Sequence, residues 1–188
     1  WELSATLNDW RGGDFMGENI TFYSEGDRFN FRAAAILLDR GRVLVSRDVP
    51  DAGYTLRPGG RVQMLETAET TICRELSEEL GIHCTAPQLL WVTENRFYSG
   101  FYRRRTHEIC YFYLVTEPLP AALTEREGEF YLHDNTDQIN IPFRWVPLDA
   151  LQHSTLRPAF LRQALTAPLP TAPVVLSLND LPEEPTLD

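Results

Sequence analysis

The segment GRVQMLETAETTICRELSEELGI, residues 60–82, constrains the fold more than any other part of the chain. Thr67 is a suitable N-cap and Gly81 suits the C′ position, so these residues predict a helix between them. Four apolar residues inside that helix recur every four positions: Ala68, Ile72, Leu76 and Leu80. This spacing predicts an amphipathic helix that packs one stripe onto a hydrophobic core.

Three glutamates, Glu75, Glu78 and Glu79, lie beside that stripe near the C-terminal end of the predicted helix. Like charges at this spacing repel one another, and the helix dipole disfavours anions at this end. A solvated acidic face is the ordinary explanation of helical charges, but such faces usually alternate in sign. Here only Arg74 offers a nearby cation. The carboxylates therefore need another source of attraction.

The loop before the helix contains Pro58, Gly59 and Gly60. Glycine allows backbone to approach a ligand closely, which leaves carbonyl oxygens available for coordination. Oxygen ligands gathered without His or Cys select a hard cation such as Mg²⁺ or Mn²⁺. The pattern therefore predicts a divalent metal site between the loop and the helix.

The rest of the chain reads as one layered α/β or α+β domain, because predicted strands and helices interleave along 188 residues of which 43% are hydrophobic. Apolar or alternating runs predict strands over 20–23, 31–39, 42–48, 88–98, 107–118 and 143–151, and a short helix over 156–165. The runs 31–39 and 42–48 are expected to form a hairpin. The segment 121–141 has no clear periodicity, and a loosely held tail is expected beyond Thr166.

Charge and cysteine usage exclude several classes of protein. A net charge of -10 argues against a broad basic surface that grips nucleic acid, so no stable nucleic-acid complex is expected. Three scattered cysteines fit reduced thiols better than a disulfide framework. No apolar run approaches the length that spans a membrane. We therefore expect a cytoplasmic protein with no membrane partner.

The segment 60–82 also resembles the Nudix box, G-x5-E-x7-R-E-U-x-E-E-x-G-U, at every defined position. Flanking strand-like segments extend the resemblance over 28–166, leaving an N-terminal extension (1–27) and a proline-rich acidic tail (167–188). The resemblance implies a three-layer α/β/α sandwich with a mixed β-sheet. It also implies Mg²⁺- or Mn²⁺-dependent hydrolysis of the diphosphate linkage in a nucleoside diphosphate derivative.

The resemblance assigns a role to each constrained polar position. The implied metal ligands are Glu75, Glu78, Glu79 and the carbonyl of Gly59. Arg74 is expected to orient the glutamates by ion pairing, and Glu66 to support the loop or contact the metal through water. The proton acceptor is expected to be Glu78 or Glu79, although some families recruit a base from a later loop. The acidic residues available for that purpose are Glu125, Glu127, Glu129, Asp134 and Asp137.

The substrate is less constrained, and several alternatives stay open. Arg57, Arg47 and Tyr98 are the candidate substrate-binding residues. The arginine- and aromatic-rich segment 94–108 either stacks a base and pairs with phosphate or is an exposed turn. The expected substrate is a small-molecule nucleotide, namely a nucleoside triphosphate, a diphosphate or a dinucleotide. The alternatives are a catalytically silent nucleotide sensor and an isoprenoid-diphosphate isomerase, which would need a catalytic cysteine. A homodimer also stays open.

Overall fold

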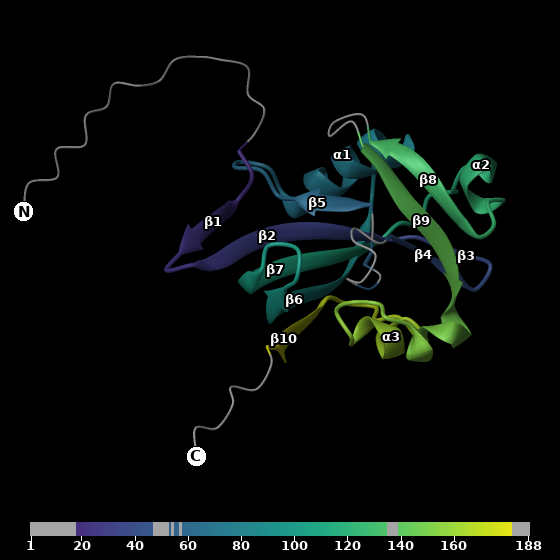
Figure 1. Ribbon diagram of the computed structural model, residues 1–188. Coiled ribbons are helices and arrows are strands. Elements are labelled where there is room, and N and C mark those ends of the chain that lie inside the picture. Colours follow the sequence, from purple (N-terminus) through teal and green to yellow (C-terminus); the bar gives the residue numbers. More distant parts are fainter. Residues whose placement is uncertain (1–17, 47–52, 54, 57, 135–138, 182–188) are drawn as a thin grey trace, which may run out of the picture.

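The computed structural model describes residues 18–46, 53, 55–56, 58–134 and 139–181. Ten strands, three short or medium helices and one 3-10 helix follow one another in this part of the chain (Figure 1). In order they are β1 (Thr21–Ser24), β2 (Asp27–Ile36), β3 (Leu38–Asp39), β4 (Arg42–Ser46), β5 (Gly59–Arg61), α1 (Ala68–Leu80), β6 (Gln88–Ser99), β7 (Arg104–Leu114), α2 (Ala121–Thr124), β8 (Glu129–Asp134), β9 (Ile139–Pro147), the 3-10 helix η1 (Leu148–His153), α3 (Leu161–Ala164) and β10 (Val174–Asp180).

The strands form two sheets. The larger has the order β1-β2-β7-β6-β10, with β5 also paired to β2, and the smaller has the order β3-β4-β9-β8. The pairs β2–β7 and β6–β10 are parallel, whereas the other pairs are antiparallel, so the larger sheet is mixed. Figure 1 shows α1 on one side of the strands and α3 on the other. The predicted α/β fold with a mixed sheet is confirmed.

Strand β2 separates two hydrophobic cores. Ala33 and Ala35 belong to the core on the α1 side, whereas Ala34 and Ile36 belong to the core beneath η1 and α3. Successive side chains of a strand point to opposite faces, so both faces of β2 are covered. The alanines leave room for backbone to approach, which brings β5 and α1 close to β2.

Helix α1 forms as its sequence predicts. The Thr67 hydroxyl accepts a hydrogen bond from the Thr70 N–H at 3.0 Å, and Gly81 adopts a left-handed conformation with φ of 65°. Ile72 and Leu76 are fully buried in the core on this side of the sheet. Burying each of these side chains contributes about 2 kcal/mol. The cap, the buried stripe and the glycine together fix the position of every polar residue of α1.

The predicted hairpin of 31–39 with 42–48 forms only at its turn. Leu38–Asp39 (β3) pairs with Arg42–Val43 of β4, whereas the run up to Ile36 belongs to β2 in the larger sheet, and β4 pairs further with β9. Apolar runs do not specify which strand lies beside them. The strand predicted over 143–151 ends at Pro147, and its last residues form η1 instead.

The segment beyond Thr166 is more ordered than expected. Residues Val174–Asp180 form β10, which pairs in parallel with Trp91–Phe97 of β6. The Asn95 side-chain amide also donates a hydrogen bond to the Asp180 carboxylate at 3.3 Å. The expectation of a loosely held tail is therefore wrong for this stretch. The segment 121–141, which shows no clear periodicity, likewise contains α2 and β8.

Within the described residues, no helix combines the length and apolar character needed to cross a membrane.

Candidate active site

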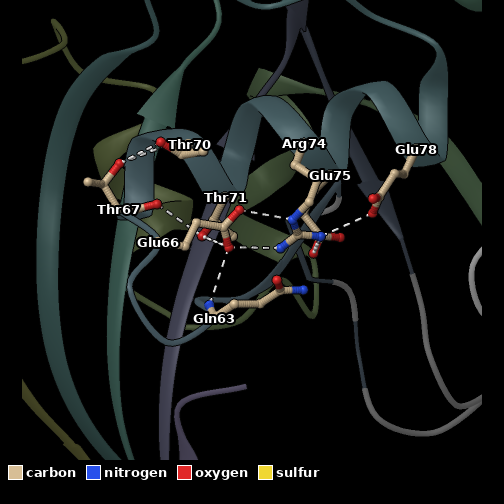
Figure 2. Close-up of polar contacts among 8 residues, drawn as sticks. All are labelled: Gln63, Glu66, Thr67, Thr70, Thr71, Arg74, Glu75 and Glu78. Carbon is tan, nitrogen blue, oxygen red and sulfur yellow. Dashed lines mark hydrogen bonds and ion pairs between the residues drawn. The ribbon is translucent and has the colours of Figure 1, made fainter. Parts of the chain in front are cut away.

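The guanidinium group of Arg74 lies at the centre of a cluster of carboxylates (Figure 2). Its Nε and Nη2 donate to the two carboxylate oxygens of Glu66 at 3.0 and 3.2 Å. Its Nη1 donates to Glu75 Oε1 at 2.8 Å and to Glu78 Oε2 at 3.0 Å. A planar guanidinium can bind several carboxylates in fixed directions, which an ammonium cannot do. Arg74 therefore orients three carboxylates at once.

Glu66 connects the loop before α1 to the helix itself. Besides Arg74, its carboxylate accepts hydrogen bonds from the Thr71 hydroxyl at 2.8 Å and from the Gln63 N–H at 3.2 Å. Burial alone would raise the pKa of Glu66, but these hydrogen bonds, first of all that from Arg74, outweigh burial and hold the pKa below its ordinary value. Glu66 is thus an ionised carboxylate that links the loop to the helix.

Gly60 makes room for the carboxylate of Glu75. A Cβ atom at this position would lie 1.9 Å from Glu75 Oε1 and 2.3 Å from its carboxylate carbon. In the register of β5 with β2, Gly60 lies opposite Ala33, whose side chain belongs to the core on the α1 side. Any side chain at Gly60 would therefore push the carboxylate away from the loop. Gly59 is constrained as well, because a Cβ there would lie 2.6 Å from the Ala33 carbonyl oxygen.

Replacing Gly60 by alanine tests this contact. Glu75 must move away from the new methyl group, so we expect turnover to fall by about 10²-fold, the cost typical of a displaced active-site group. Strain of this kind also costs about 1–3 kcal/mol of stability. Steady-state kinetics and chemical denaturation measure the two effects. The matched control is Gly100→Ala, because a Cβ there meets nothing within 4 Å. Full activity of Gly60→Ala would show that Glu75 need not stay where it lies.

The glutamates of α1 differ in environment. Glu79 is buried, with 8% of its surface exposed, whereas the Glu78 side chain is 36% exposed. Burial raises the pKa of Glu75 above its ordinary value, and the Glu78 charge adds to this increase, while Arg74 and Arg32 oppose it. The raised pKa means that burial and the Glu78 charge destabilise the ionised form of Glu75. A bound cation would stabilise that ionised form.

The donor atoms at this place fit a hard divalent cation. The carboxylates of α1 supply oxygen, and Arg74 contacts only one oxygen each of Glu75 and Glu78. The Gly59 carbonyl oxygen accepts a hydrogen bond from the Arg32 guanidinium (Nη2) at 3.5 Å, so this oxygen already faces a cation. Within the described part of the chain, no group of three or more Asp, Glu, His or Cys side chains is already arranged to bind a metal ion. The carboxylates are instead arranged around Arg74.

Of the predicted substrate residues, only Tyr98 lies in the described part of the chain. Arg57 and Arg47 lie outside the described residues. Tyr98 lies near the end of β6, opposite Arg105, and its side chain is 51% exposed. Of the later acidic residues, Glu125, Glu127 and Glu129 are exposed, the side chain of Asp134 is not described, and Asp137 lies outside the described residues.

The arginine-rich hairpin between β6 and β7 is largely engaged in structural contacts. Arg105 donates to both oxygens of Asp27 at 2.9 and 2.8 Å. Arg104 donates to the Gly26 carbonyl at 3.3 Å and lies over the Tyr23 ring at 5.0 Å from its centroid. These contacts hold the β6–β7 hairpin against the β1–β2 turn. They favour the exposed-turn interpretation for these two arginines.

A family model described as the NUDIX domain matches residues 29–166. The chain belongs to the Nudix family. It is a Nudix hydrolase, an enzyme class that acts on pyrophosphate-containing substrates and in general uses divalent metals. A comparison with curated proteins found no match.

Several solved structures are similar to this chain. The mMutator MutT protein from Bacillus halodurans is 16% identical with a TM-score of 0.57, and the match covers 81% of this chain and 91% of that chain. A MutT NUDIX hydrolase from Burkholderia pseudomallei is 26% identical with a TM-score of 0.45, covering 64% and 84%. The NUDIX domain of Shewanella oneidensis NrtR, solved with ADP ribose, is 20% identical with a TM-score of 0.45, covering 73% and 83%.

Sequence reasoning missed a second polar group of this Nudix domain. Arg28, Arg61 and Tyr102 lie together although they come from β2, β5 and the β6–β7 hairpin. Arg61 directly follows Gly60, the first glycine of the box. Arg28 and Arg32 are four residues apart in β2, so their side chains point to the same face of the strand. These two signals were available in the sequence. Tyr102 could not be connected to them without the fold.

Proposed function

We propose that this Nudix hydrolase is a divalent-metal-dependent pyrophosphohydrolase that cleaves the diphosphate linkage of a nucleoside diphosphate derivative by attack of water. The substrate class is a nucleoside triphosphate, a nucleoside diphosphate or a dinucleotide. The observation that carries the proposal is the Arg74 guanidinium, which donates hydrogen bonds to Glu66, Glu75 and Glu78. These carboxylates lie beside a loop in which Gly60 leaves no room for a side chain.

The residues that would hold Mg²⁺ or Mn²⁺ are Glu75, Glu78, Glu79 and the carbonyl of Gly59. Such an ion neutralises charge on the diphosphate and lowers the pKa of bound water. In this proposal the chain itself does the rest. Arg74 keeps Glu75 and Glu78 in place, Glu66 fixes the loop to α1, and Glu78 or Glu79 accepts the proton of the attacking water.

The alternatives receive less support. A nucleotide sensor without catalytic activity does not need Arg74 to hold the carboxylates in place, or a glycine at position 60 to make room for Glu75. Both features are present here. An isomerase needs an available cysteine, but Cys110 is buried beneath η1 and α3. Burial, followed by contact with Cys73, raises the pKa of Cys84 to about 12. These environments suit core thiols.

A nucleotide panel tests the proposal. We expect turnover of at least one nucleoside triphosphate, diphosphate or dinucleotide with Mg²⁺ or Mn²⁺, with a nucleoside monophosphate or similar phosphate among the products. Chelation with EDTA is expected to abolish turnover, and restored metal to recover it, because the ion neutralises the charge that repels water. Product identification by chromatography is the measurement. Unchanged turnover in EDTA would contradict the metal dependence.

A further inference from the structure

The chain turns back along α1 directly after the helix ends. Gly81 closes the helix in a left-handed conformation, and the Ile82 N–H donates to the Leu76 carbonyl at 3.1 Å. Cys84, two residues later, therefore lies beside the helix rather than beyond its end. It belongs to the core on the α1 side, against which Cys73 of α1 packs, and the two cysteine side chains are in contact. The turn thus brings two thiols together.

The loop that carries Cys84 is held in place by Glu117, which follows β7. The Glu117 carboxylate accepts hydrogen bonds from the Thr85 N–H at 2.7 Å, from the Thr85 hydroxyl at 3.2 Å and from the Ala86 N–H at 3.2 Å. The Cys84 thiol itself donates to the other oxygen of this carboxylate at 3.9 Å. These contacts keep Cys84 beside Cys73.

The three cysteines of the chain differ in access and in place. Cys84 is buried, with 6% of its surface exposed, whereas Cys73 is half-buried. A small oxidant can therefore reach Cys73, whose contact with Cys84 supplies a second thiol. Cys110 is 2% exposed and belongs to the core on the other face of the sheet. The chain thus contains one pair of thiols and one separate thiol.

The pair encloses the polar site residues of α1. Between the two cysteines lie Arg74, Glu75, Glu78 and Glu79. Successive residues of an α-helix are about 100° apart around its axis, so Cys73 and Glu75 are about 200° apart. The Cys73 side chain is therefore on the opposite side of α1 from the Glu75 carboxylate. A bond between Cys73 and Cys84 would constrain the helix without occupying the space of the carboxylates.

We propose that Cys73 and Cys84 are a redox-active pair, which a hydroperoxide converts into an intramolecular disulfide that ties α1 to the loop after it. The Cys73 sulfur attacks the O–O bond of the peroxide, so Cys73 becomes a sulfenic acid and the peroxide is reduced to an alcohol or water. The Cys84 sulfur then attacks the Cys73 sulfur, and the hydroxide that leaves takes the Cys84 thiol proton as water. Two thiols are oxidised for each peroxide reduced, and a dithiol reductant reverses the bond.

Peptide mapping of the full chain tests whether this bond forms. Reduced protein is desalted, exposed to hydrogen peroxide for increasing times, alkylated in denaturant and digested with trypsin. Trypsin cleaves after Arg74, so Cys73 and Cys84 fall in different peptides, and we expect a species that joins them and disappears with dithiothreitol. The number of free thiols is expected to fall from three to one. Unchanged thiols, a covalent dimer, a bond to Cys110 or oxidation of Cys73 alone would each overturn the proposal.

Thermal unfolding tests whether the bond constrains α1. A disulfide restricts the unfolded chain, so the melting temperature of the oxidised wild type is expected to exceed that of the reduced wild type by at least about 4 °C. Cys73→Ser lacks the accessible thiol and is expected to show no rise after peroxide treatment. The matched control is Cys110→Ala, which keeps the pair and is expected to show the full rise. Equal melting temperatures of oxidised and reduced wild type would rule out the constraint.

Turnover separates a constraint on the helix from damage to the site. Because Cys73 lies on the side of α1 away from Glu75, the oxidised protein is expected to keep most of the kcat of the reduced protein. A fall of about 10²-fold, the cost of displaced catalytic groups, would show that the bond moves the carboxylates and would contradict this account. The peptide map and the melting temperature require no substrate, so they decide the disulfide independently of the hydrolase proposal.

Discussion

Replacing Glu79 by glutamine is expected to lower kcat by at least about 10²-fold, the contribution typical of one acid–base group. Glu79 is the most buried of the three glutamates beside the stripe of α1, and glutamine keeps its size while removing its charge. In the proposed site that charge serves as a metal ligand, a proton acceptor or both. Steady-state turnover at saturating Mg²⁺ is the measurement.

The fold of this variant is expected to survive. Glu79 contributes no part of the apolar stripe, so we expect a melting temperature within about 5 °C of the wild type, which for a chain of this size corresponds to about 1.3–2.5 kcal/mol. The matched control is Glu69→Gln, which removes an exposed carboxylate from the first turn of the same helix. It is expected to leave kcat unchanged. If Glu79→Gln kept more than a tenth of the wild-type kcat, Glu79 would have neither role.

Replacing Arg74 by methionine is expected to produce the largest loss of stability. The Arg74 side chain is 24% exposed, and those of Glu66 and Glu75 are 11% and 15% exposed, so removal of Arg74 leaves partly buried carboxylates without their cation. Breaking such a cluster costs about 3 kcal/mol, or about 6–12 °C in melting temperature for a chain of this length. Turnover is expected to fall by about 10²-fold, because Glu75 and Glu78 lose their common anchor.

The effect of Arg74→Met depends on pH in a defined direction. The pKa of Glu66 lies below its ordinary value of 4.5 in the folded protein, so the stabilisation by ionised Glu66 is present above pH 4.5 and is lost as the pH falls through the lowered pKa. The deficit of the variant is therefore expected to be largest at pH 7 and to narrow below pH 4.5, where protonated carboxylates no longer need Arg74. Denaturation at several pH values measures it. Arg74→Lys, which keeps the charge without the fork, is the control. A constant deficit at all pH values would contradict this account.

The sequence determined the local parts of the site. Thr67, the apolar stripe and Gly81 fix α1 by contacts within a few residues, so the helix and its carboxylates were predictable. The resemblance to the Nudix box also implied that Arg74 would pair with Glu75 or Glu78; in the structure Arg74 contacts both of them and Glu66 as well. The role of Gly60 was predictable only as backbone access, and its contact with Glu75 was not.

Tertiary structure alone decided what lies opposite this helix. Strand order brings Arg28, Arg61 and Tyr102 to one face of the sheet, and it makes 174–180 an edge strand beside β6. Periodicity reports whether a residue faces a core, but each pairing partner is chosen by packing over the whole sheet. A helix is stabilised by neighbours four residues apart, whereas a strand is stabilised by residues that are distant in the chain. The sequence by itself therefore specified the acidic helix and its chemistry, and the fold specified the arginine face across β5.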